Sequence, residues 1–100
     1  MYINTTFRIE KEIEEAFIAW INASYVPALA RISREFPPQF MRIITDDPEA
    51  GVCLAVLSRL SAHMCDMWES ETHPLLLTEM HSRWGDKALY FTTLMEEVNP

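Results

Sequence analysis

Two periods of apolar residues alternate along the chain, and each predicts a different kind of element. Residues 2–9 alternate between apolar and polar side chains, which is typical of a strand with one covered face. The members of the covered side are Ile3, Thr5, Phe7 and Ile9. From residue 13 the spacing becomes that of an amphipathic helix. Its apolar stripe is formed by Ile13, Phe17, Trp20, Ile21 and Ser24. Pro27 is expected to kink this helix.

In the second half of the chain, the alternation typical of strands again gives way to the spacing of a helix. Pro37 and Pro38 break the first helix, and residues 39–45 alternate as a second strand. The turn-forming run 46–51 joins it to a third strand, residues 52–57, as a hairpin. A second helix follows, and residues 87–95 alternate again as a fourth strand. Within that helix we expect Ser61 as the N-cap, a disturbance at Pro74, and Gly85 in the left-handed conformation at the end.

The order of these elements, βαββαβ, predicts a single ferredoxin-like α+β domain over residues 1–100. A four-stranded antiparallel sheet carries two helices on one face. Right-handed crossovers place the first and third strands in the centre and the second and fourth at the edges.

The third strand, Val52-Cys53-Leu54-Ala55-Val56-Leu57, is apolar on both sides. Successive strand residues point to opposite faces, so this run makes both faces of the sheet apolar. Two helices cover one face, and we expect a second copy of the chain to cover the other, as in a dimeric α/β barrel. On this interpretation Leu54→Asp or Val56→Asp, placed on the uncovered face, would split or unfold the homodimer.

The charge balance excludes two classes of partner. The formal net charge is −7, with only eight lysines and arginines, so we expect neither nucleic acid nor a membrane as a partner. The first residues carry no basic, apolar signal-peptide pattern, which predicts a cytoplasmic protein. Cys53 and Cys65 are interpreted as reduced thiols, although the sequence leaves open whether they form a disulfide.

No catalytic, metal-binding or phosphate-binding motif stands out, and we expect no metal and no cofactor. Candidate polar residues of a pocket or of the dimer interface are still present. They are Asn4, Thr6, Arg8, Tyr25, Arg42, His63 and His73. Asn4 and Thr6 either bond across the two-fold axis or line a small-molecule pocket with Arg8 or Arg42. Tyr25, just before Pro27, either packs in the core with a hydrogen-bonded hydroxyl or points into the cleft between helix and sheet.

Three stretches together resemble an uncharacterised family of short bacterial proteins, a domain of unknown function. The stretches are Ile3-Asn4-Thr5-Thr6-Phe7, Phe17-x-x-Trp20 leading to Tyr25-Val26-Pro27, and Trp84-Gly85 followed by Leu89-Tyr90-Phe91-Thr92-Thr93-Leu94. The family is similar to the dimeric α/β-barrel superfamily, in which two ferredoxin-like protomers press their sheets together. That superfamily includes cofactor-free monooxygenases, isomerases and haem-binding proteins, so the resemblance implies a fold and a dimer but no reaction.

Three functions therefore remain open. The first is a homodimer that binds a small molecule in the helix–sheet cleft or at the sheet interface. The second is a cofactor-free enzyme of monooxygenase or isomerase type, with His63, His73 or Tyr25 moving protons. The third is a dimerising interaction module. A cavity of about 300 Å³ or more with polar side chains converging in it would favour the first two, and a shifted histidine pKa inside it would favour the enzyme.

Overall fold

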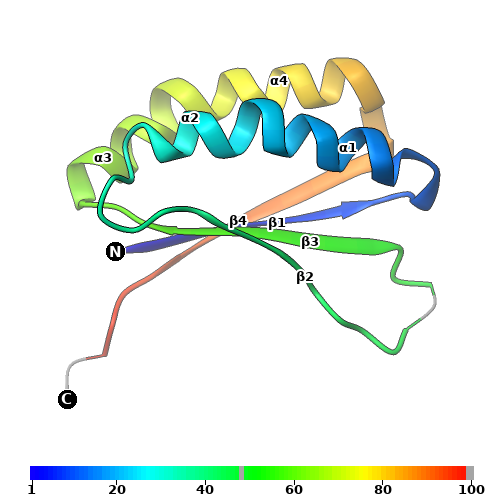
Figure 1. Ribbon diagram of the computed structural model, residues 1–100, viewed down its shortest axis with the longest axis horizontal. Coiled ribbons are helices and arrows are strands. Elements are labelled where there is room, and N and C mark those ends of the chain that lie inside the picture. The colour runs from blue at the N-terminus through cyan, green and yellow to red at the C-terminus, as the bar shows by residue number, and fades with distance from the viewer. Residues whose placement is uncertain (48, 99–100) are drawn as a thin grey trace.

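The computed structural model describes residues 1–47 and 49–98. Within these ranges, four antiparallel strands form one sheet, and two helical segments cover one of its faces (Figure 1). The strands are β1 (Tyr2–Ile9), β2 (Gln39–Arg42), β3 (Val52–Arg59) and β4 (Ala88–Met95). Their spatial order, β2-β3-β1-β4, places the first and third strands in the centre. The predicted ferredoxin-like α+β arrangement is confirmed.

Each helical segment is interrupted by a π-helical turn that directly precedes a proline-containing stretch. The first segment comprises η1 (Lys11–Ile13), α1 (Glu14–Trp20), the π turn η2 (Ile21–Tyr25) and α2 (Val26–Ala30). The second comprises α3 (Ala62–Met67), the π turn η3 (Trp68–Thr72), α4 (His73–Trp84) and η4 (Gly85–Lys87). A proline lacks its N–H and crowds the carbonyl four residues earlier, and a wider turn accommodates both effects. Pro27 and Pro74 therefore follow widened turns, and both segments continue past them.

The π turn in the first segment changes which residue faces the core. A regular helical period places Ser24 on the apolar stripe, but in the structure Ser24 is half-buried and Tyr25 is buried. Because the π turn contains one more residue than an α-helical turn, the next buried position falls one residue later in the sequence. Tyr25 therefore occupies the place that the helical period assigns to Ser24.

The sides of β3 differ from those expected. Leu54 lies opposite Phe7 and Val56 opposite Thr5, and all four residues are buried beneath the helices. The expectation that Leu54 and Val56 lie on the uncovered face is therefore wrong. A run that is apolar on both sides contains no polar residue to mark which alternate set faces outward. The uncovered side of β3 instead carries Cys53, Ala55 and Leu57, and we call this side of the sheet the outer face.

The connections between elements explain several boundaries. β2 ends at Arg42 rather than at residue 45, and the pairing closes with the Ile43 amide, which donates to the Cys53 carbonyl at 2.9 Å. After Ile43 the chain forms local hydrogen bonds instead of pairing with β3. The Thr45 hydroxyl, for example, accepts a hydrogen bond from the Asp47 amide at 3.2 Å. Pro48, in the predicted hairpin turn, lies outside the described residues.

The two helix boundaries predicted around the second segment are found where expected. Ser61 caps α3, since its hydroxyl accepts from the Met64 amide at 3.2 Å. Gly85 ends α4 with a positive φ of 55°, but its ψ of −131° lies outside the left-handed helical region, so the conformation predicted for it is wrong. A positive φ is readily available to glycine, which has no Cβ.

The layer between helices and sheet is rich in aromatic side chains. The Phe7 ring contacts those of Phe17 and Tyr25 edge-on, each with 5.3 Å between ring centroids. Such rings bury the largest apolar areas of any side chains, so this cluster dominates the core. Cys53 and Cys65 are both free thiols. No helix in the described part of the chain has the length and apolar character needed to cross a bilayer.

Candidate functional site

An open groove of about 760 Å³ runs between α4 and the edge strand β4. Tyr90 and Leu94 belong to the helix side of β4, since they lie opposite Phe7 and Ile3. Both are nevertheless 46% exposed, so the helix layer does not extend over the edge strand. This incomplete coverage leaves the groove. Its walls include His73, Leu77, Thr78, Met80, Tyr90 and Thr92.

A buried tyrosine–histidine pair lies beside this groove, and its histidine, His73, lines the groove. The Tyr25 hydroxyl lies 2.8 Å from His73 Nε2, and the two residues are only 1% and 4% exposed. Tyr25 ends the π turn of the first helical segment, and His73 directly follows the π turn of the second. The pair thus links the two segments across 48 residues of sequence.

The π turn η3 also places Trp68 against the histidine. The Trp68 and His73 rings are stacked, with centroids 5.1 Å apart and planes inclined by 20°. Side chains five residues apart on a regular α-helix would point about 140° away from each other. The wider turn brings them to the same side of the segment, so the stacking depends on the π geometry. Trp68 in turn contacts the Tyr25 ring edge-on at 5.5 Å.

Burial keeps both members of the pair uncharged. Removal from water lowers the pKa of His73 to about 4, and burial raises the pKa of Tyr25 well above its usual value. At neutral pH the bond therefore joins a phenol and a neutral imidazole, which carries one N–H and one acceptor nitrogen. When the phenol donates to Nε2, the proton of the imidazole is on Nδ1.

The second ring nitrogen of His73, Nδ1, is not used in a hydrogen bond within the described residues. Within residues 1–47 and 49–98, His73 makes one side-chain hydrogen bond, through Nε2. Every buried side-chain nitrogen or oxygen of these residues has a hydrogen-bond partner. His73 lines the groove, and its Nδ1 has no hydrogen-bond partner among the described residues.

Two threonines extend the polar wall towards β4. The hydroxyls of Thr5 and Thr92 lie 3.2 Å apart, on neighbouring strands, and Thr92 lines the groove. The Thr5 hydroxyl also lowers the pKa of the Tyr25 phenol, against the larger effect of burial. Polar atoms therefore continue from His73 through Tyr25 and Thr5 to the outer part of the groove.

The remaining candidate residues lie elsewhere. Asn4, Thr6 and Arg8 are on the outer face of β1, where Asn4 Nδ2 donates to Thr6 Oγ1 at 3.1 Å. Arg8 donates to the Glu49 carbonyl at 3.0 Å.

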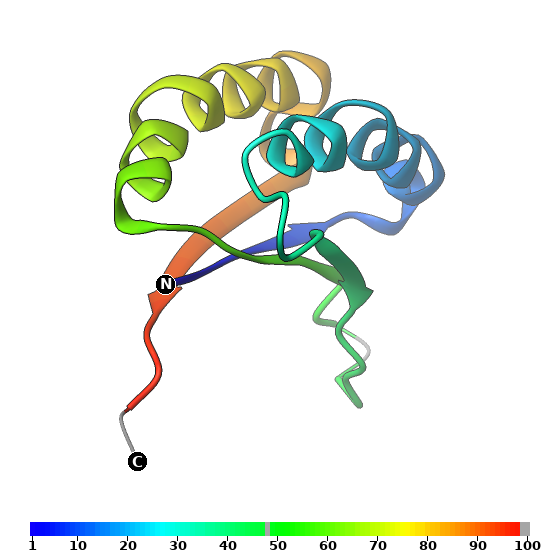
Figure 2. The same cartoon turned by 60° about the vertical axis from the view of Figure 1, so that its left-hand side comes forward.

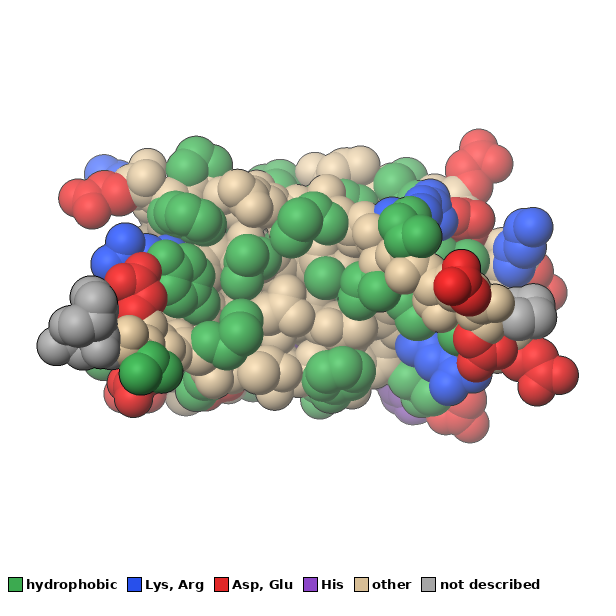
Figure 3. Space-filling model, turned by 90° about the horizontal axis from the view of Figure 1, so that it is seen from below, with side chains coloured by type: hydrophobic (Ala, Val, Ile, Leu, Met, Phe, Trp, Pro, Cys, Tyr) green, Lys and Arg blue, Asp and Glu red, His purple; other side chains and the backbone are tan. Residues whose placement is uncertain are grey.

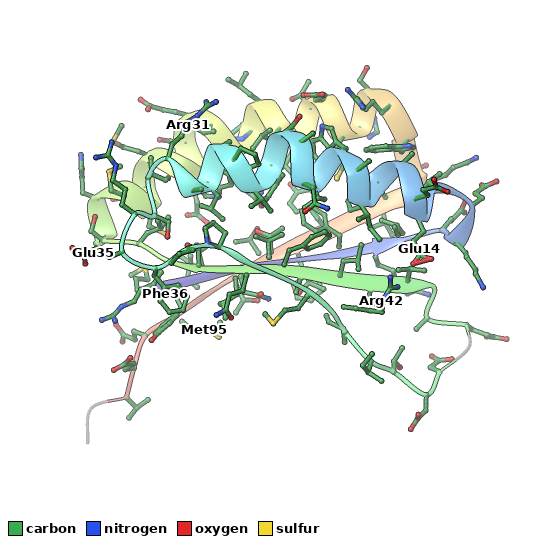
Figure 4. The ribbon with its side chains drawn as sticks, viewed as in Figure 1. Glu14, Arg31, Glu35, Phe36, Arg42 and Met95 are labelled. Atoms are coloured by element: carbon green, nitrogen blue, oxygen red, sulfur yellow. The ribbon has the colours of Figure 1, made fainter. Side chains whose placement is uncertain are left out.

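Arg42 and His63 are also remote from the groove. Arg42 is at the helix side of the sheet and forms an ion pair with Glu14 at 2.7 Å (Figure 4). His63 is exposed on α3. Of the seven candidates, the structure brings Tyr25 and His73 together beside the groove, and Asn4 and Thr6 together on the outer face.

Sequence reasoning missed Trp68, Thr5, Tyr90 and Thr92 as parts of the site. The five-residue spacing from Trp68 to His73, immediately before Pro74, is the one signal of the wide turn that joins them. Across the described residues, no three side chains of His, Cys, Asp or Glu converge as metal ligands.

Comparison with known proteins gives a family but no activity. No curated protein matches the sequence. A family model matches residues 1–98, a range that includes all of the strands and helices described above. The resemblance to an uncharacterised family is thereby confirmed. The chain belongs to the family DUF4286, a domain of unknown function.

Proposed function

We propose that this protein binds a small, mostly apolar molecule in the groove between α4 and β4, with His73 providing a hydrogen bond. The observation that carries the proposal is a buried, neutral histidine in the wall of an open groove, whose Nδ1 has no hydrogen-bond partner among the described residues. The volume of about 760 Å³ lies within the roughly 300–1,000 Å³ of ligand pockets. One well-placed polar group among apolar walls is the usual composition of such sites.

The charges around the groove narrow the ligand class. Among the described residues that line it, none is a lysine or an arginine, whereas Glu69 and Asp86 contribute carboxylates. An anionic molecule would meet no lysine or arginine there and would be repelled by these two carboxylates. The ligand is therefore a neutral molecule or one that carries a positive charge.

A cofactor-free enzyme is the second candidate, and the shifted pKa of His73 is the observation that favours it. The direction of the shift limits this role. An imidazole with a pKa near 4 is a weak base at neutral pH, whereas an efficient general base has a pKa close to the working pH. Hydrogen bonding to a ligand requires only the neutral imidazole that the burial already provides. Binding is therefore the better supported of the two.

A homodimer formed through the outer face is part of the same proposal. Alternate residues of all four strands make this face, and Leu89 and Phe91 on it are 54% and 61% exposed. Figure 3 shows apolar side chains across the middle of the face and charged groups gathered at its two ends. An apolar surface with a charged rim is the composition of an interface core.

Two segments extend beyond the outer face and could contact the second chain of the proposed homodimer. The β2–β3 connection and the residues after β4 both project below the sheet, from opposite ends (Figures 1 and 2). They carry Ile44 and Val98, which are almost fully exposed. The sheet alone measures roughly 400 Å² in projection, and its accessible area, the quantity to compare with the ~800 Å² that each partner of a stable complex buries, is larger. Apolar residues on projecting segments would add to this area. Light scattering tests the dimer: two chain masses are expected, and one mass at micromolar concentration contradicts it.

Filling the groove tests the binding function. In Leu77→Trp the larger indole occupies space in the groove wall, so a neutral aromatic probe such as 2-naphthol should bind at least tenfold more weakly. Binding is measured by titration with NMR detection of the Thr78 and Thr92 amides. In the matched control, Leu75→Trp, the same indole is added to the same helix at a residue that is 73% exposed and outside the groove.

Three results would decide between the candidates. Loss of binding in Leu77→Trp with retention in Leu75→Trp supports the proposal. Saturable binding by the wild type that is unchanged in Leu77→Trp places the ligand elsewhere and contradicts it. A probe that shifts no groove amide in the wild type contradicts it as well and favours the dimerising module.

A further inference from the structure

β4 is one of the two edge strands of the sheet, and it has the features of an unprotected edge. All eight of its residues pair with β1, and its other edge faces no strand of residues 1–47 and 49–98. The strand contains neither a proline nor a charged side chain. Soluble proteins usually block an exposed edge with such residues or keep the edge strand short. The opposite edge strand, β2, follows this rule, because it has four residues and ends at Arg42.

The register of the sheet shows which backbone groups of β4 point to the free edge. The Glu10 amide donates to the Lys87 carbonyl at 3.0 Å, and these two residues continue the register of β1 and β4. In an antiparallel ladder, residues that bond to the neighbouring strand alternate with residues whose N–H and C=O point away from it. The residues of β4 that bond to β1 are therefore Leu89, Phe91, Thr93 and Met95. The N–H and C=O groups at the free edge belong to Tyr90, Thr92 and Leu94.

The free edge and the groove between α4 and β4 are continuous. Tyr90 and Thr92 line the groove, and Leu94 is on the same side of β4, opposite Ile3. Leu89 lines the groove as well, although its side chain belongs to the outer face, so the groove extends to the backbone of β4. A strand added at this edge would bond to alternate residues of β4, and its residues opposite them would direct their side chains to the groove side.

The charges of the groove favour a cationic partner. Glu69 precedes α4 and Asp86 follows it, so the two carboxylates belong to opposite ends of the helical wall. Neither forms an ion pair within the described part of the chain. The 12 residues of α4 extend over about 18 Å, the length of roughly six residues of an extended chain. A peptide with a cationic residue at each end of such a stretch complements both carboxylates. A second copy of β4 does not, because it has no charged side chain.

We propose that the free edge of β4 binds an extended peptide by strand addition, with apolar side chains in the groove and cationic side chains towards Glu69 and Asp86. The proposal rests on the groove of the proposed function and names a peptide as its ligand. In strand addition, the backbone hydrogen bonds provide affinity and the alternate side chains provide specificity. The added strand runs antiparallel to β4, which is the more stable pairing per residue.

Hydrogen exchange of the β4 amides, followed by NMR, tests strand addition. In the free protein the amides of Tyr90, Thr92 and Leu94 should exchange faster than those of Phe91 and Thr93, because only the latter bond to β1. The probe is the peptide acetyl-Lys-Thr-Val-Thr-Val-Thr-Lys-amide, whose lysines and valines share one face. At saturation it should slow the exchange of the three edge amides at least tenfold.

Modified peptides separate backbone pairing from filling of the groove. N-methylation of both valines removes the amides that would bond to β4, so binding should weaken at least tenfold. N-methylation of two threonines, whose amides point away from β4, should have little effect. Glutamates in place of both lysines should weaken binding by roughly tenfold, because Glu69 and Asp86 would repel them.

A matched pair of protein variants changes the edge itself. Thr92→Pro removes an amide at the free edge, where a proline is compatible with the sheet, and should abolish protection by the peptide. Thr92→Val removes the same hydroxyl but keeps the amide, and should still be protected. Equal binding by the two variants would contradict strand addition.

Other results would overturn the assignment. Groove amides that shift without protection of the edge amides would contradict strand addition but leave the proposed function intact, since binding of 2-naphthol tests that function separately. No protection at about millimolar peptide would also contradict it. Tighter binding of the glutamate peptide would exclude the cationic class. Edge amides that become protected without peptide, as the protein concentration rises, would show that a second copy of β4 occupies the edge instead.

Discussion

The two faces of the sheet are built from similar side chains but have different surroundings. On the helix side, Phe7 is completely buried and contacts Phe17 and Tyr25. On the outer side of the neighbouring strand, Phe91 is mostly exposed. Met95 also lies below the sheet, on the outer side (Figure 4). The comparison shows that hydrophobicity along a strand does not indicate by itself which face stabilises the protomer.

The same comparison separates folding from association. An apolar side chain that the helices cover contributes to the free energy of unfolding of one chain. The same side chain on the outer face contributes only when another molecule covers it. Substitutions on the two faces should therefore change different measured quantities, and three predictions use this difference.

The largest effect is expected from a matched pair of phenylalanines. Phe7→Ala should lower the free energy of unfolding by about 3–5 kcal/mol, because it leaves a cavity in the aromatic core. Phe91→Ala should lower the stability of the protomer by less than about 1 kcal/mol. Urea denaturation at several protein concentrations separates protomer stability from association. Equal losses for the two variants, independent of concentration, would contradict the distinction between the faces.

The next largest effect on the free energy of unfolding is expected from a positive charge on His73 beneath the helices. Low pH introduces this charge without a mutation. The pKa of His73 is about 4 in the fold and about 6.5 in the unfolded chain. Between these values the unfolded chain binds more protons, so the free energy of unfolding should fall as the pH falls from about 6.5 to 4. The total loss is roughly 3 kcal/mol, and above about pH 6.5 this contribution no longer changes.

Two histidine variants isolate this effect. His73→Gln should flatten the dependence of stability on pH between about 6.5 and 4, measured by urea denaturation at a series of pH values. His63→Gln, on the exposed side of α3, should retain the slope of the wild type. An unchanged slope in His73→Gln would show that other groups account for the acid sensitivity.

A charge on the outer face should act on association instead of folding. Phe91→Glu should raise the dissociation constant of the proposed homodimer by about a hundredfold, because the interface would bury an unpaired carboxylate. Its protomer should stay folded, since this position is mostly exposed in one chain. Light scattering after size exclusion measures the mass. In Leu75→Glu, the same charge is placed on an exposed residue of α4, and the dimer should persist. Dissociation in both variants would exclude the outer face as the specific contact.

Much of the fold follows from periodicity in the sequence. Alternation in residues 2–9 locates β1, which has one face in the core, and alternation in residues 87–95 locates β4, although Ala88 is its one buried residue. The face assignment of β3 failed, because Leu54, Ala55, Val56 and Leu57 contain no polar residue that distinguishes the sides. The end of β2 was predicted too late, since the local bonds of Thr45 and Asp47 outcompete further pairing.

The candidate site was less accessible to sequence reasoning than the fold. Tyr25 and His73 are visible as individual candidates, but their contact depends on how two helical segments pack over the sheet. Local periodicity contains no information about that packing. It also assumes a regular helical turn, which assigned Ser24 instead of Tyr25 to the buried stripe. The sequence contains Pro27 and Pro74, which explain why wide turns are favourable there, but not which residues they join.

The π turn η3 makes the length of the second helical segment as important as its composition. Deleting a single residue from Trp68–Thr72 would allow a regular α-helical turn there, although Pro74 would still donate no backbone hydrogen bond. Trp68 and His73 would then be four residues apart, and on a regular α-helix such side chains point only about 40° apart, on the same face. Winding all five residues into a regular α-helix would instead point the two side chains about 140° apart and turn His73 away from both the indole and the Tyr25 hydroxyl. The contact between Trp68 and His73 thus requires either the present five-residue spacing with its wide turn or a spacing of four without one.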